Sequence, residues 1–524
     1  MCATHAKESS AGVERAPACF ALDGSRLTLE ALDAALEGPV HLTVSEDVWA
    51  KVEAAAARIQ QLCGGSQAVY GVNTGIGPLC RTRIPADQLQ ALQRNLILSH
   101  AVGVGPPAPP QVVRWMMLLK AYGLAHGASG ISRRTLQILI DLLKADALPV
   151  IPMQGSLGAS GDLAPLAHMV LPMIGEGQLQ WRGGSPAPAS TVLKQLGLAA
   201  MRLGPKEGLA LINGTQFMSA IAATVLVRAR RLVRHCDIIA AMSLEGIAGS
   251  VKPFDERLHA LRPHRGAIES AANVRSLLAE SDILPSHADC DRVQDPYSIR
   301  CVPQVHGASR DALRHAAQIV EDEINSVTDN PVIVEGGDVV SGGLFHGQPL
   351  ALAMDYAAMA LAELGSISER RSYLLLEGVG GLPKLLIPNA GVNSGLMIPH
   401  YVAAALVSEN KGLCFPASVD SIPTGMGQED HVSMGARSAV KCLQVLENVE
   451  QVLAIEQLLA AQALDFRAPL RAGVGPRLAH ETIRERIPHA ASDRVFKYDV
   501  DASLAILRSC RVLDAVESRV GRLA

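Results

Sequence analysis

The sequence predicts a mainly α fold, with a core bundle of long helices and a smaller N-terminal region of mixed loops and helices. Hydrophobic residues make up 48% of the 524 residues and aromatic residues only 3%. The apolar side chains are therefore mostly small or aliphatic, which suits closely packed helices. Apolar residues also recur at helical spacing through most of the chain.

Individual elements follow from this spacing. Helices are predicted over 47–61, 311–327, 349–376 and 394–410, and a long apolar segment runs from 207 to about 247. Residues 332–334 and 339–340 form a strand-like pair joined by a glycine turn, which predicts a hairpin. A helix of roughly thirty residues follows 434, with one face formed by Val445, Val449, Val452, Leu459 and Ala463.

Four regions are expected along the chain. Residues 1–21 carry no periodic pattern and predict a flexible tail. No stretch has the composition of a linker, so the remaining boundaries rest on changes of pattern. They give an N-terminal region over 22–205, a central helical bundle over 206–480 and a C-terminal helical region over 481–524.

Composition and charge exclude several classes of protein. The net charge is −4, so neither nucleic acid nor an anionic membrane is an expected partner. Ten scattered cysteines without a Cys-x-x-Cys pair are typical of reduced thiols in a cytoplasmic protein. No uninterrupted apolar run appears long enough to span a bilayer. The sixteen histidines form no His-Glu-x-x-His helix, so no metal site is expected.

The segment 152–168 carries the most distinctive chemistry, because it contains Ala159-Ser160-Gly161 among further glycines. A glycine nitrogen has no neighbouring Cβ, so in a tight bend the nitrogen of Gly161 can attack the carbonyl of Ala159. Loss of water and of the Ser160 hydroxyl would leave a methylidene group on an imidazolone ring. The backbone itself would then supply a strong electrophile.

An ordinary turn is the alternative interpretation of this tripeptide. A second copy, Ala128-Ser129-Gly130, precedes a run with helical spacing, where Ser129 or Ser132 is most simply a turn or N-cap residue. The tripeptide alone therefore favours a turn. The longer pattern over 155–168 is what distinguishes the first copy from the second.

That longer pattern resembles the prosthetic-group segment of the aromatic amino acid ammonia-lyases. Members of this family form 4-methylidene-imidazol-5-one (MIO) from Ala-Ser-Gly, and the resemblance extends from Leu27 to about Arg471. It implies that MIO forms from Ala159, Ser160 and Gly161 and captures the substrate amine as a covalent adduct. No bound organic cofactor or metal is then expected.

A glycine-rich loop over 69–78 cannot form a stable helix. It resembles the Tyr-Gly-x-Asn-Thr-Gly-x-Gly motif of the family, which implies that Tyr70 is the acid/base residue. A turn with Tyr70 packed inward is the structural alternative. Next in the chain, Ser99-His100 matches the substrate-selecting pair of the histidine branch, although a histidine at a helix end is more often structural.

Asn213 interrupts the apolar segment that begins near 207, because Asn-Gly is costly inside a helix. The resemblance places Asn213 beside MIO and the substrate, and a helix N-cap is the alternative role. The segment 293–301 matches a further family motif, which implies substrate contacts for Gln294 and Arg300 and places Tyr297 near MIO. Arginine can grip a carboxylate through two parallel hydrogen bonds, although a surface charge is the simpler interpretation of Arg300.

Two more residues complete the candidate site. Phe345 matches an active-site phenylalanine, with core packing as the alternative. Glu429 lies in Gln-Glu-Asp-His-Val-Ser-Met, a motif resembling the histidine branch, in which the glutamate contacts imidazole; a negative helix N-terminus is the alternative. The sequence departs from typical histidine enzymes at Ile76, Lys384, Ala417 and Met426.

The resemblance implies elimination of ammonia from L-histidine to give trans-urocanate. The alternatives are a lyase or 2,3-aminomutase acting on tyrosine, another aromatic amino acid or a modified histidine, or a non-catalytic member of the fold. Because Tyr70 and Glu429 lie far apart in the chain, we expect distant segments, from neighbouring subunits of a homotetramer, to form the site.

Overall fold

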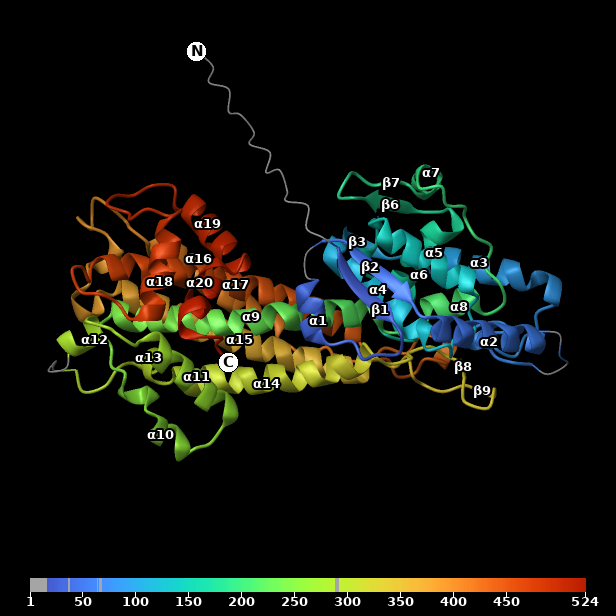
Figure 1. Cartoon of the computed structure of the whole chain (residues 1–524), viewed down its shortest axis with the longest axis horizontal. Coiled ribbons are helices and arrows are strands. Elements are labelled where there is room, and N and C mark those ends of the chain that lie inside the picture. The colour runs from blue at the N-terminus through green and yellow to red at the C-terminus, as the bar shows by residue number, and fades with distance from the viewer. Residues whose placement is uncertain (1–16, 36–37, 64, 66–67, 288–291) are drawn as a thin grey trace, which may run out of the picture. The chain divides into compact units, whose positions relative to one another are not determined.

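The computed structural model describes residues 17–35, 38–63, 65, 68–287 and 292–524. The chain forms two compact units, and helices dominate it, which confirms the mainly α prediction (Figure 1). The first unit contains Met1–Gly155, Ser160–Ala220 and Ile324–Phe345. The second contains Ser156–Ala159, Ile221–Glu323 and His346–Ala524.

The first unit combines short strands with helices of moderate length. Helix α4 is buried along almost its whole length, and α2 and α5 pack against it. Helices α3, α6 and α8 pack against one another. The helices of this unit are α1 (Leu29–Ala34), α2 (Glu46–Cys63), α3 (Leu89–His100), α4 (Pro110–Ala125), α5 (Arg133–Lys144), α6 (Leu163–Val170), α7 (Ala189–Gln195) and α8 (Glu207–Ile212).

Every strand among the described residues belongs to the first unit. Strands β1 and β2 pair in parallel, with Ala18 opposite Val40, whereas β3–β5, β4–β6–β7 and β8–β9 are antiparallel. The β8–β9 pair confirms the predicted hairpin. The strands are β1 (Ala18–Leu22), β2 (Val40–Val44), β3 (Val104–Pro107), β4 (Ala147–Pro149), β5 (Pro152–Gln154), β6 (Gln178–Trp181), β7 (Ala187–Pro188), β8 (Val332–Ile333) and β9 (Val339–Val340).

Strand β1 corrects the predicted tail. Residues 18–21 are ordered in β1 because β2 provides backbone partners about twenty residues further along the chain. A pairing of this kind leaves little local pattern in a five-residue strand. Residues 1–16 of the predicted tail lie outside the described residues.

Long helices form the second unit. Helix α15 packs against α14, α16 and α17, and α14 also packs against α11. The helices are α9 (Gln216–Gly246, which begins in the first unit), α10 (Glu256–Ala260), α11 (Arg265–Leu277), α12 (Ile283–Ser286), α13 (Tyr297–Arg300), α14 (Val302–Glu323), α15 (Gln348–Leu376), α16 (Met397–Leu413), α17 (Gly435–Asp465), α18 (Val474–Arg484), α19 (Phe496–Arg508) and α20 (Arg511–Val520).

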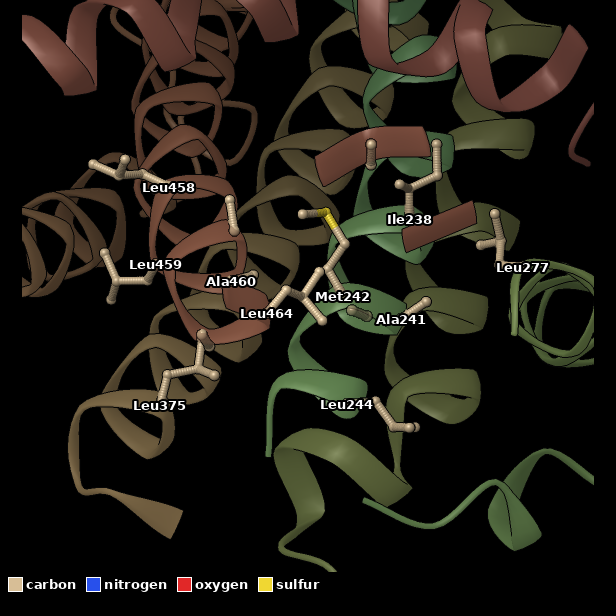
Figure 2. Packing of buried hydrophobic residues seen from close by; sticks show 14 of the residues in the cluster. Ile238, Ala241, Met242, Leu244, Leu277, Leu375, Leu458, Leu459, Ala460 and Leu464 are labelled. Carbon is tan, nitrogen blue, oxygen red and sulfur yellow. The ribbon is translucent and has the colours of Figure 1, made fainter. Parts of the chain in front are cut away.

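Aliphatic side chains fill the core of the second unit. Figure 2 shows part of this core, in which Met242 from α9, Leu277 from α11, Leu375 from α15 and Leu464 from α17 belong to one buried cluster. Alanines such as Ala460 lie between the larger residues and let the helices approach closely. The sparse aromatic content of the sequence therefore matches the way this core is packed.

The predicted helices correspond to observed ones, with corrections for α14, α16 and the segment after 207. Helices α2, α15 and α17 closely match their predicted ranges, and α16 is displaced by three residues at each end. Helix α14 begins at Val302, nine residues before its predicted start, because Pro303 is tolerated in a first turn that needs no N–H donor. The segment after 207 forms two helices, α8 and α9, with a break over 213–215.

Buried charges link the long helices of the second unit. The fully buried guanidinium of Arg371 on α15 pairs with Glu456 on α17 through two hydrogen bonds of 2.5 and 2.8 Å. Ser243 on α9 donates to the same carboxylate at 2.6 Å. These bonds satisfy charges that would otherwise be costly in an apolar core.

Helix α15 contains Asp355 and Glu363, so it is not an uninterrupted apolar run and does not contradict the expectation from the sequence. Among the described residues, α15 is the one helix that is long and apolar enough, by length and composition alone, to cross a membrane. However, 67% of its apolar window is buried inside the protein, as in the core helix of a soluble protein.

Candidate active site

The segment 152–168 contains strand β5, a bent loop over 155–162 and the first part of helix α6. Strand β5 pairs with β3, and α6 begins at Leu163. Asp162 precedes α6, and its carboxylate accepts the backbone N–H of Met218 at 2.9 Å. The tripeptide is divided between the two units, because Ala159 belongs to the second and Ser160 and Gly161 to the first.

The carbonyl oxygen of Ser160 receives two donors in the first unit. The side-chain Nδ2 of Asn213 donates to it at 2.9 Å, and the backbone N–H of Gly214 donates at 3.4 Å. Gly214 in turn accepts the N–H of Asp162 at 2.7 Å and forms a parallel bridge with Gly161. The break between α8 and α9 is thus bonded directly to the Ala-Ser-Gly segment.

Two glycines allow the bend. Gly161 has φ of +71°, and a Cβ there would lie 2.1 Å from the carbonyl oxygen of Gly214. Gly158 has φ of +79°, and a Cβ there would lie 2.2 Å from Ser433 Oγ. No other residue type fits either position without rearrangement.

Ala159 packs within the second unit against the end of the Gln-Glu-Asp-His-Val-Ser-Met motif. It is buried with Val432 and Met434, and the N–H of Met434 donates to the Leu157 carbonyl at 3.0 Å. Helix α17 begins one residue later, at Gly435. The motif therefore lies in the loop that precedes the helix.

The residues present fit an MIO group. Glycine at position 161 has no side chain of its own to hinder attack by its nitrogen, and its φ of +71° permits the tight bend that cyclisation requires. Asn213 Oδ1 is buried and has no hydrogen-bond partner among the described residues, so it could accept an N–H from a bound amine. No group of three potential metal-ligating side chains occurs in the described part of the chain.

Asn213 itself occupies a position that differs from the N-cap alternative. It is the C-cap residue of α8, with extended φ and ψ of −87° and 128°. Its backbone N–H still bonds to Leu209, while its side chain turns to Ser160. The Asn-Gly break therefore ends one helix before the next begins.

Tyr70 lies in a turn of the first unit, as the glycine-rich sequence predicts. Its hydroxyl oxygen accepts the N–H of Gly77 at 3.2 Å, so the loop folds back on its own tyrosine. Asn73 fastens the loop, because its Oδ1 accepts the Val69 N–H at 2.7 Å. The side chain of Tyr70 is partly exposed.

Ser99 and His100 are adjacent at the end of α3. Ser99 Oγ lies 3.0 Å from His100 Nδ1, and it also donates to the Leu96 carbonyl at 3.2 Å. The loop that follows is tied to the central segment, since Gly103 N–H donates to His168 Nε2 at 3.0 Å. Burial lowers the pKa of His168, which favours the neutral imidazole that can accept this bond.

The motif over 293–301 contains the short helix α13 in the second unit. The Arg300 guanidinium stacks over the Tyr297 ring at 4.3 Å, and Tyr297 itself is 69% exposed. Arg300 is only partly exposed, and its Nε is buried without a partner among the described residues. Arg300 is therefore more than a solvated surface charge. Gln294 is exposed.

Glu429 lies in a tight turn of the second unit. Thr424 Oγ1 donates to its carboxylate at 3.0 Å, and the two residues form an antiparallel bridge. Since α17 begins six residues later, the helix N-terminus interpretation of Glu429 is wrong. In the same unit, the rings of His346 and His431 stack at 5.6 Å. Phe345, in the first unit, is partly buried.

A buried lysine next to Asn213 was not among the site residues predicted from the sequence. Lys120 on α4 is only 2% exposed, and its Nζ donates to the Asn213 carbonyl at 2.7 Å. Lys206 is also buried and pairs with Asp329 at 2.7 Å. A lysine within the apolar run of residues 112–125 was the available signal, because a buried ammonium requires partners.

The fold and the bent Ala-Ser-Gly segment together are those of a carbon–nitrogen lyase. Residues 27–485 match the family described as aromatic amino acid lyase, and the chain belongs to this family. It is 48% identical to a histidine ammonia-lyase of Gloeobacter violaceus over 505 residues, which cover 96% of this chain and 98% of the relative.

Solved structures of related enzymes support the same family assignment. The crystal structure of histidine ammonia-lyase from Trypanosoma cruzi has a TM-score of 0.88 and 42% sequence identity, covering 95% of each chain. The structure of tyrosine aminomutase from Streptomyces globisporus has a TM-score of 0.90 and 34% identity, covering 96% of this chain and 99% of that one. The first similarity combines higher identity with nearly the same agreement of fold.

Proposed function

We propose that the protein eliminates ammonia from L-histidine to give trans-urocanate, using an MIO group formed from Ala159, Ser160 and Gly161. The observation that carries this proposal is the 48% identity to a histidine ammonia-lyase across 96% of the chain. The Ser99-His100 pair and the Glu429 motif support histidine as the substrate. MIO supplies an electrophilic carbon that can accept the substrate amine, which is otherwise a poor leaving group.

The chain's own residues then have separate tasks. Tyr70 removes the β-proton, and the N–H of Gly77, which donates to its hydroxyl oxygen, orients the side chain for this role. Arg300 binds the substrate carboxylate, a task for which its unpartnered Nε is suited. Asn213 and Tyr297 hold the amine end in place.

The remaining candidate residues recognise the imidazole ring of the substrate. His100 and Glu429 hydrogen-bond the imidazole, with Ser99 fixing the orientation of His100 and Gln294 and Phe345 completing the pocket. Polar groups of this kind disfavour phenylalanine, because an apolar ring would leave them without partners.

The proposal also covers the oligomeric state of the protein and its location in the cell. The candidate residues are distributed between the two units, and Tyr297 is exposed in the single chain. We propose a cytoplasmic homotetramer in which neighbouring subunits complete each active site. A small amino acid is the ligand, and neither nucleic acid nor membrane is a proposed partner.

A second candidate is a 2,3-aminomutase or a lyase acting on tyrosine. The TM-score of 0.90 to a tyrosine aminomutase favours retaining it, because the same fold serves both outcomes. Histidine remains the preferred substrate, since sequence identity to that aminomutase is only 34%.

Product analysis tests these proposals. Purified protein is incubated separately with L-histidine, L-tyrosine and L-phenylalanine, and the products are separated and identified by mass. We expect urocanate and ammonia from histidine, and a loss of at least about 10³-fold in rate for Ser160→Ala. A β-amino acid product, or turnover of tyrosine alone, would replace the histidine proposal. No turnover of any amino acid would indicate a non-catalytic member of the fold.

A further inference from the structure

Lys120 lies behind the candidate active site in the first unit. Its Nζ donates to the backbone carbonyl of Asn213 at 2.7 Å and lies 3.4 Å from Gln216 Oε1. Gln216 is itself fixed, because its Nε2 donates to Thr328 Oγ1 at 2.8 Å. The lysine therefore bridges α4 to the break between α8 and α9.

The peptide unit that Lys120 binds carries one donor to the Ser160 oxygen, and the side chain of Asn213, attached to the same unit, carries the other. The carbonyl of this peptide unit belongs to Asn213 and its N–H to Gly214, and that N–H points to the Ser160 oxygen at 3.4 Å. The Asn213 side chain supplies the shorter bond, 2.9 Å, to the same oxygen. A donor on the carbonyl of a peptide strengthens its N–H as a donor, because hydrogen bonds in series polarise one another.

Resting on the function proposed above, we infer that Lys120 is a positioning residue, whose Nζ holds the Asn213–Gly214 peptide so that two donors stay directed at the Ser160 oxygen. It touches neither the substrate nor the reacting atoms in this assignment. Its effect passes through the peptide that it binds.

The Ser160 oxygen matters because of the chemistry of ring formation. When the nitrogen of Gly161 bonds to the carbonyl carbon of Ala159, the Ala159 oxygen leaves as water with the Gly161 and Ser160 amide protons. The Ser160 hydroxyl leaves as a second water with the Ser160 α-proton. The Ser160 carbonyl survives as the ring carbonyl, conjugated with the new methylidene. Donors aimed at that oxygen therefore polarise the electrophile.

Burial and neighbouring charges shift the pKa of Lys120. Burial lowers its pKa to about 7, whereas Asp329 and Asp162 oppose this shift and Lys206 adds to it. An amine is a hydrogen-bond donor with or without its extra proton, so the positioning role persists in both states. The neighbouring cation, Lys206, donates instead to the Ser129 carbonyl at 2.8 Å.

The test compares Lys120→Met with wild type by intact mass, near-ultraviolet absorbance and kinetics. The absorbance of the MIO ring is measured as the difference between the spectrum of each chain and that of Ser160→Ala, which cannot form the ring. We expect the absorbance band of the MIO ring to move to shorter wavelength in Lys120→Met. Hydrogen bonds to a conjugated carbonyl stabilise its polar excited state, and this variant weakens them. We also expect kcat to fall about 10- to 100-fold while KM changes less than about threefold.

Lys206→Met is the matched control, since it removes another buried lysine of the same unit that binds a different carbonyl. The absorbance band of Lys206→Met should stay at the wild-type wavelength even if this variant is less stable. A folded Lys120→Met chain that fails to lose two waters would also support the inference. Complete loss of two waters with an unchanged band and kcat would overturn it.

If Lys120→Met does not fold, the Gln216→Glu variant tests the role of Lys120 by the same measurements. A carboxylate at this position competes with the Asn213 carbonyl for Nζ, so we expect a smaller shift in the same direction. An unchanged Gln216→Glu band would overturn the inference. If the wild-type chain retains both waters, the proposed function fails, and this result is distinct from a failure confined to Lys120.

Discussion

Asn213 makes two hydrogen bonds at the candidate site and keeps one buried acceptor without a partner among the described residues. Its Nδ2 binds the Ser160 oxygen, its backbone carbonyl is held by Lys120, and its buried Oδ1 has no partner among the described residues. Leaving a buried acceptor unpaired costs free energy, so such an atom at a candidate site is expected to meet a ligand donor. The substrate amine is the natural candidate.

Replacing Asn213 with alanine tests this role. Asn213→Ala removes the shorter donor to the Ser160 oxygen, and we expect kcat to fall by about 10² to 10³. Steady-state kinetics with histidine provide the measurement. Asn448→Ala removes a part-buried asparagine that bonds to Asn410 in the second unit, and its kcat should stay near wild type. Equal losses in both variants would contradict a specific role for Asn213.

At the scale of residues, motifs could be predicted from the sequence but their partners could not. The costly Asn-Gly break drew attention to Asn213, yet local spacing could not distinguish the N-cap of one helix from the C-cap of another. Lys120 binds a residue 93 positions away, so no local pattern gives its partner. Ser132, by contrast, is an N-cap as predicted, because its interaction with Thr135 is local.

At the scale of elements, α15 and α17 depend on a buried ion pair as well as on apolar packing. Arg371→Met would leave Glu456 charged and buried without its guanidinium, although Ser243 would still donate to it. We expect the free energy of unfolding to fall by about 3 to 5 kcal/mol, measured by urea denaturation. The double variant Arg371→Met with Glu456→Met should recover much of this loss, because no buried charge is left unpaired.

An exposed ion pair provides the control for this comparison. Arg94 and Glu176 lie 2.6 Å apart, and their side chains are nearly half exposed. Arg94→Met should change the free energy of unfolding by less than about 1 kcal/mol. A double variant at Arg371 and Glu456 as unstable as the single one would contradict the charge argument and indicate a loss of shape complementarity.

His235 on α9 should make stability depend on pH. Burial, with Arg234 and Arg231 nearby, lowers its pKa from 6.5 to about 3 in the folded chain. Between these values only the unfolded chain takes up the proton, so the free energy of unfolding decreases as pH falls below about 6.5. The slope is about 1.4 kcal/mol per pH unit.

Urea denaturation at pH 7, 6 and 5 measures this dependence. We expect His235→Leu to reduce the slope by about 1.4 kcal/mol per pH unit, the contribution of one histidine, whereas leucine at the exposed His264 should leave the slope unchanged. A wild-type slope that persists in His235→Leu would assign the dependence to other groups.

Element lengths explain which parts of the fold could be predicted. Helix α17 repeats its apolar face over 31 residues, so its spacing is unambiguous. Strand β1 contains five residues without a clear alternation of apolar and polar side chains, and it pairs with β2 about twenty residues later, so no local pattern predicted it. The start of α14 was missed because Pro303 suggests a break, although proline is favourable in a first turn.

At the scale of the whole molecule, the candidate residues belong to two different units. Tyr70, His100, Asn213 and Ser160 lie in the first, whereas Arg300 and Glu429 lie in the second. From the sequence we expect these distant segments to meet in a site shared by neighbouring subunits, and this expectation is still a prediction. Mixed assemblies can distinguish a shared site from a site formed by one subunit.

Complementation between two inactive variants tests the proposed shared site. Subunits with Ser160→Ala and subunits with Arg300→Met are produced together, and their activity is compared with that of each variant alone. If each site combines Ser160 and Arg300 from neighbouring subunits, some mixed sites contain both wild-type residues. Activity should then rise well above the sum of the separate variants. Activity no greater than that sum would place both residues of a site in one chain.

The most direct measurement is the mass of the purified wild-type chain beside that of Ser160→Ala. We predict that the wild-type peptide containing residues 159–161 is lighter than its sequence requires by two water molecules, and that the Ser160→Ala peptide does not carry this double loss. An unmodified wild-type peptide in a preparation that converts histidine to urocanate would contradict a self-made electrophile at Ala159-Ser160-Gly161.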